Sequence, residues 1–87
     1  HQFKVIAVPG HTPGGICFYC EEEKILFSGD ALFCGSIGRT DLPGGNYHDL
    51  VTSLSEKIMT LPPVTTVYSG HGPETSIEYE SKYNPYL

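Results

Sequence analysis

The sequence predicts a small α/β domain with a mixed sheet of about four strands and two helices. Short β-branched and aromatic runs, each ended by glycine, proline or a charged turn, predict the strands. Apolar residues recur at helical spacing after Asn46, which predicts the first helix. A total of 87 residues is enough for one domain and too few for two.

The first half of the chain contains three predicted strands. "FKVIAV", residues 3–8, is stopped by a Pro-Gly pair. "GICFYC", residues 15–20, and "ILFS", residues 25–28, flank the charged turn at 21–24. Because the connection is short, we expect these two strands to form an antiparallel hairpin.

Residues 31–46 are predicted to form a long glycine-rich loop, a feature that is uncommon in compact domains and often functional. The helix that follows begins at Asn46, which is a suitable N-cap, with Asp49 in the favourable first turn. Its apolar face comprises Leu50, Val51, Leu54, Ile58 and Leu61. Pro62 and Pro63 end it.

The last elements are a strand over 65–69 and a short helix over 75–83. Thr75 is the expected cap of that helix, with Glu78 completing a capping box. We expect the helices to cover one face of the sheet. The opposite face then needs a cover that the sequence does not identify.

Composition excludes several classes of protein. Hydrophobic residues at 39% and charged residues at 17% exclude a disordered chain. A net charge of −5 argues against a nucleic acid or an anionic membrane as partner. No apolar run approaches the ~20 residues that span a bilayer. The chain starts at His1 without a methionine or a signal peptide, so we expect it to be cut from something longer.

The three cysteines favour a reducing compartment, and we expect the protein to be cytoplasmic. Cys17 and Cys20 form a C-x-x-C, but within a predicted strand. A separation of three places them on opposite faces of that strand. We therefore expect strand packing there and not a metal or redox site.

Three side chains that can bind metal share one local pattern. His11, Asp30 and His71 each come just after a predicted strand and beside a glycine. If these strands run the same way in one sheet, the three side chains converge at its carboxyl edge. Two imidazoles and a carboxylate suit zinc, iron or manganese. The pattern alone also fits plain surface residues in turns.

The motifs "PGHTPGG", "LFSGDALF", "GSIGRTDLPGG" and "VYSGHGPET", closed by "NPYL", occur in this order. With them, the chain resembles the metallo-β-lactamase-fold hydrolases of the glyoxalase II-like (hydroxyacylglutathione hydrolase-like) branch. The resemblance covers essentially all of residues 1–87. It implies that they form the C-terminal half of an αββα sandwich. The N-terminal half, with its His-x-His-x-Asp-His run, is absent from this sequence.

The resemblance also implies roles for the three residues. His11 would join two upstream histidines on a first zinc ion, and His71 would join an upstream Asp-His pair on a second. Asp30 would bridge both metals and is the implied catalytic residue. Iron or manganese are the alternatives to zinc. Because the other ligands lie upstream in the family, we expect the isolated chain to be inactive.

The implied reaction of the intact protein is hydrolysis of a small-molecule thioester of the hydroxyacylglutathione type. A hydroxide bridging the metals would attack the polarised carbonyl. Arg39 and Asp41, in "GRTDLPGG", are interpreted as a pair that braces the loop and not as catalysts.

Two alternatives stay open. The same fold carries iron-dependent persulfide dioxygenases and lactonases. The chain could also be a non-catalytic module that self-associates, forming a homodimer through its exposed sheet face.

Overall fold

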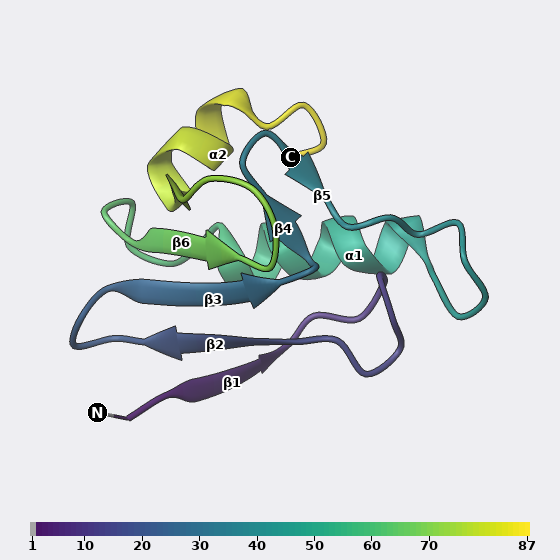
Figure 1. The fold of residues 1–87 in the computed structure, drawn as a ribbon, viewed down its shortest axis with the longest axis horizontal. Helices are drawn as coiled ribbons and strands as arrows, with labels where there is room; N and C mark the ends of the chain where they lie inside the picture. The colour runs from purple at the N-terminus through teal and green to yellow at the C-terminus, as the bar shows by residue number, and fades with distance from the viewer. Residues whose placement is uncertain (1) are drawn as a thin grey trace.

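The computed structural model describes residues 2–87 and confirms the α/β class. Its main sheet has five strands in the order β1-β2-β3-β6-β7, and α1 lies across one face of it (Figure 1). The strands of this sheet are β1 (Lys4–Ala7), β2 (Ile16–Cys20), β3 (Ile25–Gly29), β6 (Thr66–Ser69) and β7 (Thr75–Ser76).

Strand direction is what places the candidate site. β2 is antiparallel to both β1 and β3, and β6 is parallel to β3. Strands β1, β3 and β6 therefore run the same way, as their arrowheads in Figure 1 show. Their carboxyl ends therefore lie at one edge of the sheet, as expected from the sequence.

The predicted loop over 31–46 contains structure that the sequence did not predict. β4 (Leu32–Phe33) and β5 (Ser36–Ile37) pair as a separate antiparallel hairpin. β7 was also not predicted. Strands of two residues are too short to show an alternating pattern, so only their partners reveal them.

The first helix begins where the sequence predicts. α1 (Tyr47–Ser53) is capped by Asn46, whose side chain accepts a hydrogen bond from the Asp49 N–H. The helix continues as a π-helical turn, η1 (Leu54–Ile58), closed by the bond from the Met59 N–H to the Leu54 carbonyl. Leu50, Leu54 and Ile58 are all fully buried against the sheet.

The cap predicted for the second helix is wrong by one residue. α2 (Ile77–Tyr83) is capped by Ser76, whose hydroxyl accepts from the Tyr79 N–H. Thr75 lies in β7, and its hydroxyl donates to Glu80 instead. Both residues are good caps, so the local sequence does not distinguish them.

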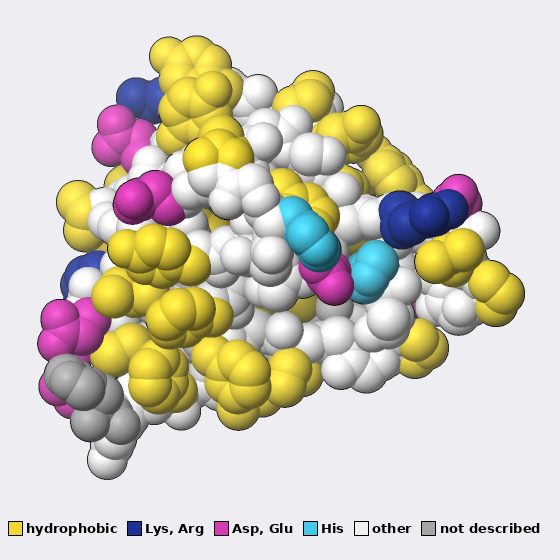
Figure 2. Space-filling model, in the orientation of Figure 1, with side chains coloured by type: hydrophobic (Ala, Val, Ile, Leu, Met, Phe, Trp, Pro, Cys, Tyr) yellow, Lys and Arg dark blue, Asp and Glu magenta, His cyan; other side chains and the backbone are white. Residues whose placement is uncertain are grey.

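The two faces of the sheet differ sharply. One face packs on α1 and η1 through Cys17, Leu26 and Val67, which are fully buried. Cys17 and Cys20 are both buried free thiols, as expected from strand packing. The other face exposes an apolar row in cross-strand register that comprises Val5, Phe18, Phe27 and Tyr68. Figure 2 shows hydrophobic side chains gathered over β1, β2 and β3.

Within residues 2–87, neither helix combines the length and the apolar character needed to cross a bilayer.

Candidate metal centre

The candidate centre lies at the carboxyl edge of the sheet. His11 follows β1, Asp30 follows β3 and His71 follows β6. Figure 2 shows two histidine side chains beside a carboxylate at this edge, next to the apolar face. The structure therefore brings together the three residues that the sequence singled out.

Asp30 and His71 are in direct contact. His71 Nδ1 lies 3.2 Å from Asp30 Oδ1, and their side chains are 80% and 50% exposed, respectively. Gly70 allows this approach, because a Cβ there would lie 2.9 Å from Asp30 Oδ1. Its N–H donates to the Gly29 carbonyl at 2.8 Å, which joins the ends of β3 and β6.

His11 is oriented by a backbone carbonyl. Its Nδ1 lies 2.8 Å from the Arg39 oxygen. A carbonyl oxygen only accepts, so Nδ1 carries the hydrogen in this bond. The Nε2 lone pair is thereby free for a metal, the arrangement typical of metal-binding histidines.

The β4–β5 hairpin borders the candidate centre through Phe33 and the adjoining Gly38. Phe33 places its ring centroid 6.1 Å from that of His71. Just after β5, Gly38 packs against Asp30, and a Cβ at Gly38 would overlap the Asp30 carbonyl oxygen. The Gly38 N–H donates to the Ala31 carbonyl at 2.9 Å. The hairpin therefore starts and ends beside Asp30.

All three candidate ligands line one cavity of about 340 Å³, together with Phe33, Gly38 and Arg39. The side chains are near one another but not assembled as a finished centre. Across residues 2–87, no group of three or more His, Cys, Asp or Glu side chains is clustered closely enough to hold a metal ion. The only close pair among the three is that of Asp30 and His71.

Arg39 and Asp41 form the pair expected in the loop. Arg39 Nε and Nη2 donate to the two Asp41 carboxylate oxygens at 2.8 and 3.0 Å. This hydrogen bonding lowers the pKa of Asp41 below its usual range and raises the pKa of Arg39. Both side chains are exposed, so the pair shapes the loop and adds little stability.

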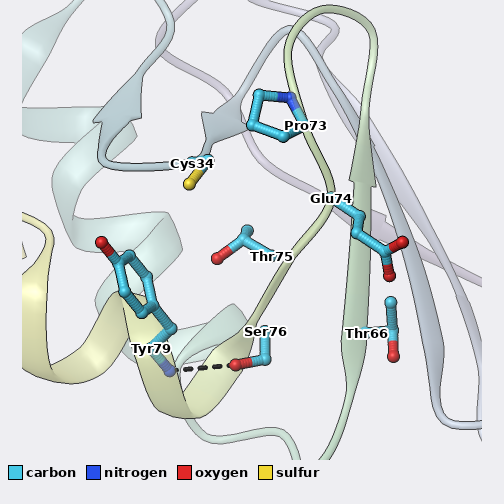
Figure 3. A pocket seen from close by; sticks show the side chains of 7 residues that line it. All are labelled: Cys34, Thr66, Pro73, Glu74, Thr75, Ser76 and Tyr79. Carbon is cyan, nitrogen blue, oxygen red and sulfur yellow. Dashed lines mark hydrogen bonds between the residues drawn. The ribbon is translucent and has the colours of Figure 1, made fainter.

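A second cavity, of about 530 Å³, lies away from the three candidate ligands. Figure 3 shows Cys34 from the β4–β5 turn, Thr75 and Ser76 of β7, and Tyr79 of α2 around it. The Ser76 hydroxyl is already engaged as the cap of α2. This cavity contains no histidine.

Sequence reasoning missed Glu80 and Phe33. Glu80 is a fully buried carboxylate bonded to the hairpin, and Phe33 packs on His71. A signal for Glu80 was present, because Ile77, Glu80 and Asn84 recur at the spacing of one helical face. An acidic residue on such a face indicates a buried polar network.

Comparison with known proteins identifies the family of this chain. The family model described as "Metallo-beta-lactamase superfamily" matches residues 1–71. The chain belongs to this superfamily. The matched part includes all three candidate ligands, up to and including His71.

The curated relatives are more than twice as long as this chain. The chain is 50% identical to "Probable metallo-hydrolase YqgX" of Bacillus subtilis, with 99% of this chain and 41% of that protein covered. It is 45% identical to "Hydroxyacylglutathione hydrolase GloC" of Haemophilus influenzae, again with 99% and 41% covered. The chain thus spans about two fifths of the length of these relatives.

The solved structure of TTHA1623 in a di-iron-bound form has the same fold over this region. It superposes with a TM-score of 0.94 at 48% identity and covers 98% of this chain and 42% of that one. The fold is therefore that of metallo-β-lactamase superfamily proteins over the matched part.

Proposed function

We propose that this chain supplies His11, Asp30 and His71 to the metal centre of a hydrolase. The observation that carries this proposal is their convergence on one cavity at the common edge of β1, β3 and β6. Two imidazoles and a carboxylate are a donor set that suits zinc, and iron or manganese as alternatives. The di-iron form of TTHA1623 supports metal binding by this scaffold.

The residues fit a metal in two respects. The Arg39 carbonyl holds the hydrogen of His11 on Nδ1, so Nε2 is available as a donor. Asp30 and His71 are already adjacent and partly exposed, so a ligand can reach them. A bound metal ion would supply an activated water at neutral pH and would polarise a carbonyl group.

We propose a thioester of the hydroxyacylglutathione type as the substrate class of the intact protein. The similarity to GloC supports this class. In this chain, Asp30 orients His71, the Phe33 ring lies beside the imidazole, and the braced loop at 39–41 borders the cavity. Persulfide dioxygenase or lactonase activity of the same fold is the alternative, and iron in the purified protein would favour the dioxygenase.

We also propose that residues 1–87 are the C-terminal half of a two-half sandwich and that the protein is cytoplasmic. The coverage of 41% in both curated relatives and the free thiols support this. The gene sequence upstream of His1 tests it. A His-x-His-x-Asp-His run there would complete the ligand set, and its absence would contradict the proposal.

Metal binding by the chain itself is tested with Co²⁺, followed by its visible absorption. We expect weak binding by the 87-residue chain and its loss in His71→Ala. His48→Ala is the matched control, because His48 is an exposed histidine on α1, outside the cavity. Equal binding by all three proteins would contradict the assignment. We expect no thioester hydrolysis by the isolated chain with added zinc.

The exposed apolar face favours a second candidate function, that of a self-associating module. Phe3, Phe18, Phe27 and Tyr68 are each 40–50% exposed on or beside this face. At ~200 Å² per ring, these four aromatics leave roughly 350 Å² of ring surface in water. The largest apolar patch on a typical monomer is of this size, and such a patch is often functional. A homodimer in solution would support this role, and a monomer at high concentration would contradict it.

A further inference from the structure

Glu80 is a buried carboxylate that the proposed metal centre does not use. It is on α2 and is fully buried. Its oxygens accept hydrogen bonds from the Gly35 N–H at 3.0 Å, the Thr75 hydroxyl at 2.6 Å and the Asn84 side-chain amide at 2.8 Å. All three donors are uncharged. Burying a carboxylate is costly, and these three bonds offset that cost.

The donors come from three separate segments. Gly35 is in the turn of the β4–β5 hairpin, Thr75 is in β7, and Asn84 follows α2. Asn84 also donates to the Ser36 carbonyl at 3.1 Å. Glu80 and these three partners, which we call the Glu80 clamp, therefore fasten the tip of the hairpin and β7 to α2.

Both fastened segments lead to the candidate ligands. The hairpin carries Phe33, whose ring contacts His71, and its end at Gly38 packs against Asp30. β7 ends the loop that carries His71. Thr75 of the clamp and Cys34 of the hairpin turn also line the cavity shown in Figure 3. The clamp is thus the shared anchor of two segments that meet at His71.

We propose that Glu80 is a positioning residue for the metal centre, because its carboxylate sets where His71 lies relative to Asp30. The role of His71 as a ligand rests on the proposed function, whereas the position of its ring does not. The Gly35 N–H contacts both carboxylate oxygens of Glu80, at 3.0 and 3.3 Å. An amide at this site has one acceptor oxygen, so in either orientation it turns an N–H group toward the Gly35 N–H. The hairpin tip would then be held less firmly, and Phe33 would shift relative to His71.

The first test follows histidine ring resonances by NMR in the 87-residue chain. Glu80→Gln should shift the His71 ring signals and weaken the Phe33–His71 cross-peaks, with the His48 signals unmoved. Glu78→Gln is the matched control, since Glu78 is an exposed glutamate on the same helix, paired with Lys82. It should leave both histidines unchanged.

The second test titrates Co²⁺ into the same proteins, at a temperature where thermal melts show each one folded. Glu80→Gln should bind Co²⁺ about tenfold more weakly and with an altered visible spectrum, the lower end of the loss seen when a group bonded directly to a metal ligand is changed, because Glu80 acts on His71 through the hairpin and β7. Glu78→Gln should match the parent chain.

The outcomes separate the two proposals. A folded Glu80→Gln chain with unmoved His71 signals overturns the positioning role. A parent chain that fails to bind Co²⁺ contradicts the proposed function, and the NMR result still decides the role of Glu80. If Glu80→Gln does not fold, Thr75→Val removes a single donor of the clamp. Unmoved His71 signals in that variant would likewise overturn the proposal.

Discussion

At the scale of single residues, glycines set how closely the candidate ligands approach. Gly70 and Gly38 each leave space that an Asp30 atom occupies: the side-chain oxygen Oδ1 at Gly70 and the carbonyl oxygen at Gly38. The glycines near His11, Asp30 and His71 therefore do more than end strands. They limit how far apart the candidate metal donors lie, and the affinity of a metal site depends on that separation.

Gly70→Ala should weaken metal binding without removing any ligand. The added Cβ would lie 2.9 Å from Asp30 Oδ1 and must push the carboxylate away from His71. We expect Co²⁺ affinity to fall about tenfold, as for other changes just behind a metal site. Gly14→Ala is the control, because a Cβ at Gly14 meets no atom within 4 Å. Equal loss in both variants would show that loop stiffness, and not the Asp30 position, controls binding.

Cys17 should make the fold sensitive to alkali. Burial raises the pKa of its thiol from 9.0 to about 11. Above pH 9 the unfolded chain releases this proton while the folded chain keeps it, so the free energy of unfolding falls as pH rises from about 9 to 11. Below pH 9 the thiol contributes no pH dependence. Urea unfolding across this range should show a steeper decline for the parent than for Cys17→Ala, and parallel declines would contradict the assignment.

At the scale of elements, short helices depend on their caps. α1 has seven residues before its π-helical turn, which is too short for helical propensity alone to stabilise it. Asn46 anchors its start twice: the side chain accepts from the Asp49 N–H, and the backbone N–H donates to the Gly10 carbonyl at 2.7 Å. The loop that carries His11 is thereby tied to the helix.

Asn46→Ala should destabilise the chain by about 1 kcal/mol, the usual cost of losing a side-chain cap. Asn46→Asp retains an acceptor and should stay close to the parent. Urea denaturation measures both. If the aspartate variant is as unstable as the alanine variant, the amide has a role other than capping.

Elements with a strong local signal were predictable, and those made by distant partners were not. β1, β2, β3 and β6 follow from β-branched and aromatic runs, and Asn46 from its cap chemistry. β4, β5 and β7 are each only two residues long and are defined by pairing with another strand. A run of two residues carries no sequence pattern that predicts this pairing. His11, Asp30 and His71 were singled out because each follows a predicted strand and lies beside a glycine, and the structure places all three on one cavity. The helical spacing of Ile77 and Glu80 indicates a shared face, but no local pattern reveals the contact of Glu80 with Gly35, which is distant in the chain.

At the scale of the whole molecule, the sheet has one covered face and one open face. α1 and η1 bury Leu26 and Val67 on the covered side. On the open side, Phe27 lies 6.0 Å from Phe3 and 5.8 Å from Tyr68, measured between ring centroids. The candidate centre lies on the same side of the molecule as this aromatic row, at the carboxyl end of the strands that carry it (Figure 2). A cover that extends along the row to the carboxyl ends of β3 and β6 would reach the edge where His11, Asp30 and His71 lie.

Neighbouring residues on β3 allow the two faces to be compared directly. Leu26→Ala should cost 2–5 kcal/mol in the free energy of unfolding, because it leaves a cavity in the core. Phe27→Ala should cost only about 1 kcal/mol in an uncovered chain, since it removes ring contacts from a surface that water already reaches. Urea unfolding, together with the mass in solution, measures both. A cost for Phe27→Ala that equals that of Leu26→Ala and grows with protein concentration would mean that a second copy covers the row. A small cost that does not change with protein concentration would mean that no second copy covers the row. The row would then be available to a different polypeptide, which could bring further ligands to the same edge.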